Sequence, residues 1–227
     1  MTRVVKSSLE PVDERPAQPI FQTPSRPLWR LFVVEVAGLS CLWLVVYGGA
    51  NWIAGLHHYR VELWSERELA IPFIPAAAVV YLSLFPMLWL SPLVLRTADR
   101  LRAFGKVIAL TIVTSGVGFL VLPFEAAYPA ERVDGLVGSI FHFADSINLR
   151  YNMLPSLHVA MATACACVYG IGHNTAVRAL WWTWAVAIAV STLVTHQHHV
   201  LDVVVGGILG LSLAMHAMKS INTNGDH

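Results

Sequence analysis

Charged residues are scarce in this chain, and their scarcity excludes an ordinary soluble domain. Only 13% of the 227 residues are charged, whereas a soluble domain usually has about 25%. The hydrophobic fraction is 56% and the mean hydropathy is +0.60. The net charge is +1 and no basic cluster is interleaved with aromatic residues, so nothing indicates a nucleic-acid partner. We therefore predict an integral membrane protein with one domain.

Cysteine is also rare. The three cysteines all fall inside apolar segments, at Cys41, Cys165 and Cys167. This placement argues against a disulfide framework and against a Cys-x-x-Cys metal site, so we interpret them as packing residues.

The chain begins with a polar segment that lacks the apolar core of a cleavable signal peptide. Prolines at positions 11, 16, 19, 24 and 27 also disfavour regular structure there. We predict that residues 1–28 form a disordered cytoplasmic tail. Residues 29–219 would form the membrane domain, and residues 220–227 a short second cytoplasmic tail.

Six apolar segments are long enough to be compared with membrane-spanning helices. A bilayer core of about 30 Å needs about 20 apolar residues in a helix. The segments are residues 30–54, 72–95, 104–123, 154–172, 177–195 and 198–218. We therefore predict an all-α membrane protein with six transmembrane helices. The last break, residues 195–199, is short enough to predict a tight hairpin.

Lysine and arginine are distributed unequally between the two predicted sides. One side carries Arg3, Lys6, Arg15, Arg26, Arg30, Arg96, Arg100, Arg102, Lys106, Arg178 and Lys219, and the other carries Arg60, Arg67, Arg132 and Arg150. The positive-inside rule then places both termini in the cytoplasm. We predict a multi-pass protein of a bacterial inner membrane.

Two polar motifs lie at the ends of apolar segments that this topology places on the same outer face, toward the periplasm or exterior. They are Leu154-Pro155-Ser156-Leu157-His158 and the stretch from Ser191 to Asp202. Ionisable groups in such places are costly and indicate function. His198 and Asp202 are four residues apart, so a helix would place them on one face. The carboxylate could then accept the imidazole Nδ1–H and leave Nε2 free as nucleophile or base. The alternative is a helix-capping pair without a catalytic role.

The first motif has the composition of an anion-binding helix start. Pro155 suits a first helical turn, because its missing N–H would be unpaired there anyway. The N–H groups of Ser156, Leu157 and His158 would then point outward and bind an anion, phosphate above all. The Ser156 hydroxyl adds a donor, and His158 could protonate a leaving oxygen. The alternative is an ordinary helix start.

Together, the two motifs resemble those of a known family. The pattern is Pro155-Ser156-Leu157-His158 followed by Ser191-Thr192-x5-His198-x3-Asp202. It resembles the type-2 phosphatidic acid phosphatase superfamily, and more narrowly its inositol phosphorylceramide synthase-like branch. The resemblance covers residues 70–218 and implies a six-helix membrane core.

The resemblance also implies a mechanism. His198 would attack phosphorus and form a phosphohistidine, Asp202 would orient the imidazole, and His158 would protonate the departing oxygen. Ser156 and neighbouring amides would hold the phosphoryl oxygens, and neither a metal nor another cofactor is implied. The substrate would be a phospholipid, an isoprenyl phosphate or a sphingolipid-type lipid. Water as acceptor would make the protein a phosphatase, and an alcohol would make it a transferase.

The sequence departs from the family pattern in its positive charges. Thr192 stands where the family keeps arginine, and the family's Lys-x6-Arg-Pro motif has no clean match. A phosphoryl transition state needs positive charge near its equatorial oxygens. Arg132 and Arg150, on the predicted outer segment, are the candidates for this role. Thr192 itself and His196 are further candidate substrate-binding residues.

Two other functions remain open from the residues alone. His158, His196, His198, His199 and Asp202 could ligate zinc, although there is no His-Glu-x-x-His motif. A transporter or non-catalytic binder of phosphate-bearing lipids could use the same anion site. Glu35, an isolated acid in the first predicted helix, would suit a proton site in a transporter, or an interhelical hydrogen bond could satisfy it.

Overall fold

The chain is helical throughout the computed structural model, which describes residues 19–124, 126–129 and 131–223, with side chains as far as residue 217. The described residues form no β-strand, and one isolated bridge pairs Val61 with Phe124. The all-α prediction is confirmed for this part of the chain. Most of the two predicted tails, residues 1–18 and 224–227, lie outside the described residues.

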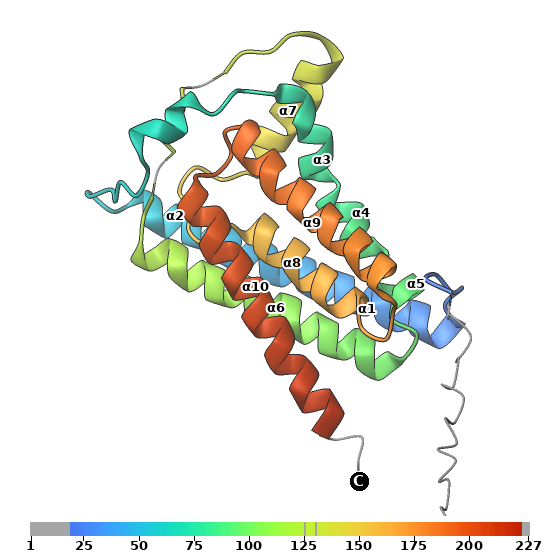
Figure 1. Cartoon of the computed structure of the whole chain (residues 1–227). Coiled ribbons are helices and arrows are strands. Elements are labelled where there is room, and N and C mark those ends of the chain that lie inside the picture. The colour runs from blue at the N-terminus through green and yellow to red at the C-terminus, as the bar shows by residue number, and fades with distance from the viewer. Residues whose placement is uncertain (1–18, 125, 130, 224–227) are drawn as a thin grey trace, which may run out of the picture.

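The helices follow one another with short connections, apart from the outer loops (Figure 1). In chain order they are α1 (Arg26–Trp43), the π-helical turn η1 (Leu44–Gly48), α2 (Gly49–Gly55), the 3-10 turns η2 (Glu66–Ala70) and η3 (Pro75–Ala77), α3 (Ala78–Leu82), α4 (Leu84–Trp89), α5 (Ser91–Val94), α6 (Ala98–Val121), α7 (Gly135–Ile147), α8 (Leu157–Tyr169), α9 (Thr175–Val194) and α10 (Val200–Thr223).

Four of the six predicted segments form helices long and apolar enough to cross a membrane. They are Arg26–Gly55, Ala98–Val121, Thr175–Val194 and Val200–Ala217. In the first of them, η1 joins α1 to α2 without a break. The other two predicted segments contain the shorter apolar stretches Pro75–Trp89 and Leu157–Tyr169.

The second predicted segment, residues 72–95, is not one helix, and its prolines explain why. The chain breaks between α3 and α4 at Ser83 and again before α5 at Leu90. Pro86 and Pro92 have no N–H to donate to the carbonyl four residues earlier, and their rings clash with it. The Ser83 hydroxyl at the first break accepts the indole N–H of Trp184 at 2.8 Å. The second predicted segment is therefore helical but interrupted at these two points.

Helix α8 lies in the middle of the bundle, with α9 on one side and α6 and α10 on the other (Figure 1). Nearly all of its residues are buried, among them Ala160, Ala162, Ala164 and Ala166. These small side chains let neighbouring helices approach closely, as membrane helix interfaces require. The first turn of α8 is therefore held in a fixed place by its surroundings.

Two glycines of α10 set its close contact with α8. A side chain at Gly206 would place its Cβ 2.5 Å from the Ser156 carbonyl oxygen, and one at Gly210 would collide with the Ala160 carbonyl. These glycines are four residues apart, as are the two carbonyl groups that they face. The start of α8 and the first half of α10 are thus packed backbone against backbone.

We expect Gly206→Ala to lower the free energy of unfolding by about 1–3 kcal/mol, because the new methyl group meets a carbonyl rather than a movable side chain. Gly207→Ala is the matched control, since its Cβ would lie 4.0 Å from a methyl group of Val159, an ordinary contact. Thermal unfolding of both variants in detergent measures the difference. Equal stability of the two variants would contradict the backbone contact.

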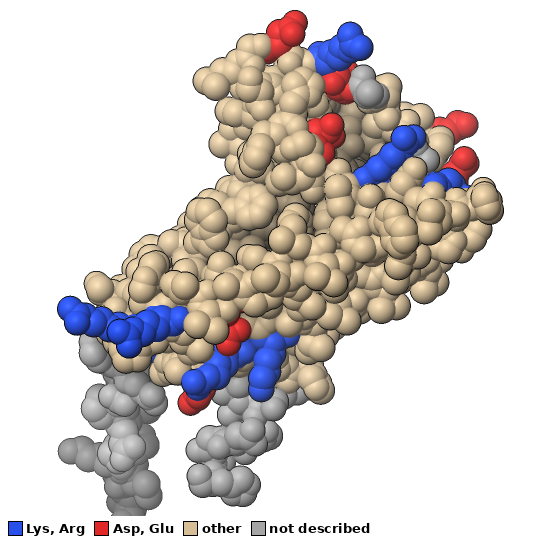
Figure 2. Space-filling model, turned by 180° about the vertical axis from the view of Figure 1, so that it is seen from behind, with Lys and Arg blue, Asp and Glu red and all other residues tan. Residues whose placement is uncertain are grey.

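Charged side chains gather at the two ends of the bundle, and a broad uncharged band separates them (Figure 2). At one end, α1 and α6 begin with Arg26, Arg30, Arg100 and Arg102. Many large hydrophobic side chains are exposed between the ends, including Val34, Leu110, Val186 and Ile208. Such a surface is typical of a protein embedded in lipid.

Candidate active site

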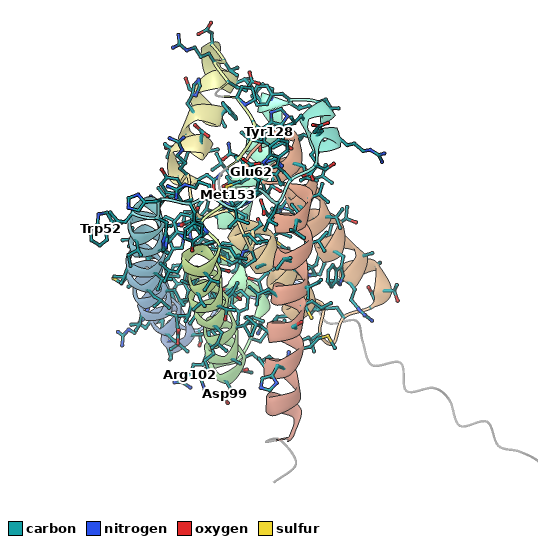
Figure 3. All side chains as sticks on the ribbon, turned by 90° about the vertical axis from the view of Figure 1, so that its left-hand side faces the viewer. Trp52, Glu62, Asp99, Arg102, Tyr128 and Met153 are labelled. Atoms are coloured by element: carbon teal, nitrogen blue, oxygen red, sulfur yellow. The ribbon has the colours of Figure 1, made fainter. Side chains whose placement is uncertain are left out.

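The two histidine motifs meet where α8 and α10 begin. The N–H of Ser156 donates a hydrogen bond of 3.0 Å to the main-chain carbonyl of Asp202. This bond joins the motif of His158 to that of His198, although forty residues separate the two histidines. Figure 3 shows this end of the bundle, which carries Met153 and Tyr128, opposite the end that carries Asp99 and Arg102.

A Schellman motif at the end of α9 holds the loop that carries His198. The N–H of His196 donates to the Leu193 carbonyl at 3.1 Å, and that of Gln197 donates to the Thr192 carbonyl at 3.0 Å. The Thr192 carbonyl also accepts the N–H of His198 at 3.1 Å. His196 has a φ of 58°, a left-handed conformation that glycine usually takes in this motif.

This loop gives Thr192 a positioning contact that sequence analysis did not foresee. Its side chain is fully buried, and its hydroxyl donates to a carbonyl of its own helix, that of Ala189, at 2.8 Å. Thr192 contacts the loop that carries His198 through its main-chain carbonyl, which accepts the N–H of His198.

Asp202 contacts both His198 and the end of its own helix. Its Oδ2 lies 3.4 Å from His198 Nδ1, and both side chains are buried. The same oxygen accepts the N–H of His199 at 2.9 Å. The distance to His198 exceeds that of an ordinary N–H···O hydrogen bond, and His198 Nδ1 is buried without a hydrogen-bond partner among the described residues.

The sequence-based placement of this pair on one helical face is wrong. Helix α10 begins at Val200, so His198 precedes it, while Asp202 lies in its first turn. The two sequence-based interpretations, a partner for histidine and a helix cap, both describe contacts of the same carboxylate.

His158 is held by an aromatic residue that sequence analysis missed. Its Nδ1 lies 3.2 Å from the hydroxyl of Tyr81 in α3, and the two rings stack with centroids 4.0 Å apart. Its Nε2 is buried and has no hydrogen-bond partner among the described residues. If the Tyr81 O–H donates to Nδ1, the imidazole proton is on Nε2, where it is available to a bound group.

Ser156 is the N-cap of α8, which begins two residues later than Pro155 predicts. Its Oγ accepts the N–H of Val159 at 3.4 Å, and Pro155 precedes the helix. The prediction that the Ser156 N–H is free for an anion is wrong, because it donates to Asp202. The Ser156 hydroxyl hydrogen remains available to donate, since the oxygen is the acceptor in the capping bond.

Of the two candidate arginines, Arg150 lies on the segment that leads directly into α8. Its guanidinium carbon is 5.8 Å from the centre of the Tyr151 ring. Arg60, which sequence analysis did not single out, lies 4.4 Å from the same ring. Arg132 is exposed in the segment before α7. Two guanidinium groups therefore share one aromatic ring a few residues ahead of Ser156.

Glu68, in η2 of the outer loops, binds the beginning of α10. Its Oε2 accepts the N–H of Val200 at 2.8 Å and lies 3.1 Å from His199 Nδ1. The other ring nitrogen of His199, Nε2, accepts the N–H of Ala127 at 3.2 Å. Since Nε2 accepts, Nδ1 carries the proton and donates it to Glu68. His199 thus connects two outer loops to the turn between α9 and α10.

Tyr128 covers this connection. Its ring stacks on those of His196 and His199, with centroids 4.0 and 4.5 Å away. Burial, with the nearby charges of Glu68 and Asp202, raises the pKa of Tyr128 to about 12, so the phenol stays neutral. His196, predicted to bind substrate, also places its Nε2 3.0 Å from the Ile71 carbonyl and so packs against the outer loops.

The charge states of Glu68 and His199 follow from their surroundings. Burial lowers the pKa of His199 below its usual value, and this outweighs the opposite effect of Asp202 and Glu68. Burial alone would raise the pKa of Glu68, but hydrogen bonds from Val200, Ser65 and His199 lower it overall. In the folded protein the pair is a neutral imidazole and a carboxylate.

We expect the stability of this outer connection to fall with acidification. Both groups have a lower pKa in the folded protein than in the unfolded chain. As the pH falls, the unfolded chain therefore binds protons first, and stability is lost. The loss begins at about pH 6.5 for the histidine and at about pH 4.3 for the glutamate. Glu68→Gln should reduce the loss of stability at the lower pH. Thermal unfolding across this range measures it, with Glu66→Gln, an exposed neighbour, as control. An unchanged pH dependence in Glu68→Gln would contradict the assignment.

No three His, Cys, Asp or Glu side chains are grouped to hold a metal ion within the described part of the chain. The donor atoms of His198 and His199 are directed to Asp202, Glu68 and Ala127. The zinc interpretation therefore has no ligand set among these residues.

The site and fold define a helical membrane protein with paired histidines at one end of the bundle. The sequence matches the PAP2 superfamily over residues 55–216, more than half of the chain, and the protein belongs to that family. Family membership supports a membrane lipid phosphatase.

Comparison with solved structures finds the crystal structure of Aquifex aeolicus LpxE. It has 20% sequence identity to this chain and a TM-score of 0.47. The match covers 76% of this chain and 94% of that chain. No significant match is found among curated proteins.

Proposed function

We propose that the protein is an integral-membrane enzyme that removes or transfers a phosphoryl group of a lipid through a phosphohistidine on His198. One observation carries the proposal: the main-chain hydrogen bond from Ser156 to Asp202 joins the motif of His158 to that of His198, which faces Asp202. His158 Nε2 is buried there without a hydrogen-bond partner among the described residues. Binding alone does not require an oriented nucleophile beside a proton donor.

The first step would exchange one bond to phosphorus for another. His198 Nε2 forms a bond to phosphorus while the bond from phosphorus to the lipid oxygen breaks. His158 acts as an imidazolium whose Nδ1–H donates to the Tyr81 oxygen. Its Nε2 proton goes to the lipid oxygen, which leaves a neutral imidazole. Asp202 stabilises the positive imidazole that results. In the second step, water or an alcohol gives its proton to His158, and its oxygen displaces His198 from phosphorus.

The phosphoryl oxygens would be held by the Ser156 hydroxyl and by positive charge from Arg150 or Arg132. Thr192 and His196 would act mainly by fixing the His198 loop, given their contacts there. This chemistry needs no metal ion or other cofactor. The substrate would be a phospholipid, an isoprenyl phosphate or a sphingolipid-type lipid, and an alcohol acceptor would match the inositol phosphorylceramide synthase-like branch.

The topology proposed with this function has six crossings, of which α3–α5 and α8 are the short ones. Both termini would be cytoplasmic, in keeping with the arginines where α1 and α6 begin. The site would face the periplasm or exterior of a bacterial inner membrane.

The test is an activity screen of the purified full chain against these three classes of lipid phosphate, with water alone and with an added alcohol. Release of inorganic phosphate supports a phosphatase, and a new phosphoester supports a transferase. Quenching during turnover with alkaline detergent should trap protein-bound phosphate that survives in base and is lost in acid, as a phosphohistidine is. Binding of lipid phosphates without turnover would instead support a non-catalytic transporter or binder.

A further inference from the structure

An apolar cavity of about 400 Å³ lies between α1, α4, α6 and α8. Its walls include Val36, Leu39, Leu84, Leu88, Ile108 and Met161. Lining residues run from Phe32 on α1 to Leu44 at the start of η1, and from Leu101 to Ile112 on α6. At 1.5 Å per residue, these stretches make the cavity about 16–18 Å long.

His158 lies at the outer end of this cavity. Only the first turns of α8 contribute to the lining, through Leu157, His158 and Met161. In the proposed reaction, His158 gives its proton to the oxygen that stays with the lipid. The carbon chain attached to that oxygen must therefore begin beside His158, where the cavity also begins.

The cavity reaches the surface that the bilayer would cover. Leu44 and Trp89 both line it and are 62% and 61% exposed on the outside of the bundle. A dry apolar space open to lipid is suited to hydrocarbon. A group of water size occupies roughly 30 Å³, so the cavity holds about a dozen methylene-sized groups. That is enough for one hydrocarbon chain but not for two.

Toward the end of the cavity that is farther from His158, a carboxyl group interrupts its apolar wall. Glu35 lines the cavity nine residues before Leu44, or about 13 Å along the helix. Gly105 makes room for it, since a Cβ there would lie 2.6 Å from Glu35 Oε2. Hydrocarbon that reaches this carboxyl group would pack against its polar oxygens and offer them no hydrogen bond, which is unfavourable.

We propose that this cavity binds a single hydrocarbon chain of the lipid phosphate and that Glu35 sets the chain length that the enzyme prefers. The proposal rests on the proposed function for the position of the phosphate. The ligand class is a lipid phosphate whose chain extends from the leaving oxygen along α1 and α6.

The test is a series of single-chain alkyl phosphates that lengthen by two carbons at each step. For the wild-type protein, kcat/KM should rise by up to about fourfold for each added methylene, because burying one methylene contributes about 0.8 kcal/mol. The rise should stop when the chain reaches Glu35. Glu35→Leu should extend the rise to longer chains by at least one step, whereas Glu35→Gln, still polar, should keep the wild-type limit.

Filling the cavity provides an independent variant. Leu39→Trp should remove the dependence on chain length, because Leu39 lines the cavity. Val34→Trp is the matched control on the same helix, since Val34 is 68% exposed and outside the lining. Equal chain-length profiles in these two variants would overturn the proposal, as would a wild-type profile without length dependence.

Two further measurements separate this proposal from the proposed function. Turnover of a water-soluble aryl phosphate tests the phosphoryl chemistry without a chain. Calorimetric binding of the matching alkyl phosphonates, which cannot be hydrolysed, tests the chain site without chemistry. If the aryl phosphate is turned over but phosphonate affinity does not depend on chain length, only the proposal of a hydrocarbon site is wrong. If phosphonate affinity depends on chain length but no substrate is turned over, only the proposed enzymatic function is wrong.

Discussion

Replacing His198 by alanine should lower kcat/KM by at least roughly ten-thousandfold, because loss of a nucleophile in such a group of residues removes the covalent step itself. The variant should also fail to accumulate protein-bound phosphate after alkaline quenching, whereas the wild type should accumulate it. The fold should persist, since the hydrogen bond that anchors His198 to the end of α9 comes from its main-chain N–H, which alanine retains.

His216→Ala is the matched control for this variant. His216 is an exposed histidine on α10, several turns away from the catalytic loop, so its loss should leave turnover unchanged. Thermal unfolding of both variants checks that they fold alike. Wild-type turnover in a folded His198→Ala protein would disprove the phosphohistidine mechanism.

Replacing His158 by alanine should lower kcat/KM for alkyl phosphates by about a hundredfold to ten-thousandfold, the usual contribution of a general acid. An alkoxide is a poor leaving group without a proton, and His158 Nε2 has the buried, unpartnered position to supply one. An aryl phosphate whose phenol leaves readily should lose much less. The measurement is kcat/KM for the two substrates in wild type and variant.

Tyr81→Phe gives a second check on this role. It keeps the stacked ring beside His158 and removes the hydroxyl that lies 3.2 Å from Nδ1. We expect a smaller loss with the same dependence on the leaving group. Equal losses for alkyl and aryl phosphates in His158→Ala would argue that His158 has a structural role instead.

The sequence predicted the long apolar helices well because hydropathy alone determines them. The same measure could not predict the breaks at Ser83 and Leu90, where proline removes particular hydrogen bonds within an equally apolar segment. It also placed the start of the last helix at His198, whereas the Schellman motif at Thr192 and His196 delays the start of α10 to Val200.

The candidate site was predictable only where its residues form a local motif. His158, His198 and Asp202 have a recognisable spacing, and the structure brings their motifs together. Tyr81, Glu68 and Tyr128 lie in other elements, and no spacing links them to the motifs. Their contacts depend on how α3 and the outer loops fold over the bundle, which is tertiary information.

The backbone contact between α8 and α10 limits how a lipid can enter. The Ser156–Asp202 hydrogen bond and the packing at Gly206 and Gly210 leave no side chain whose rotation would separate these helices. A substrate must therefore come in without parting them. We expect the helices on the other side of His158, α1 and α4, to spread apart while α8 and α10 move as one rigid body and preserve the catalytic alignment.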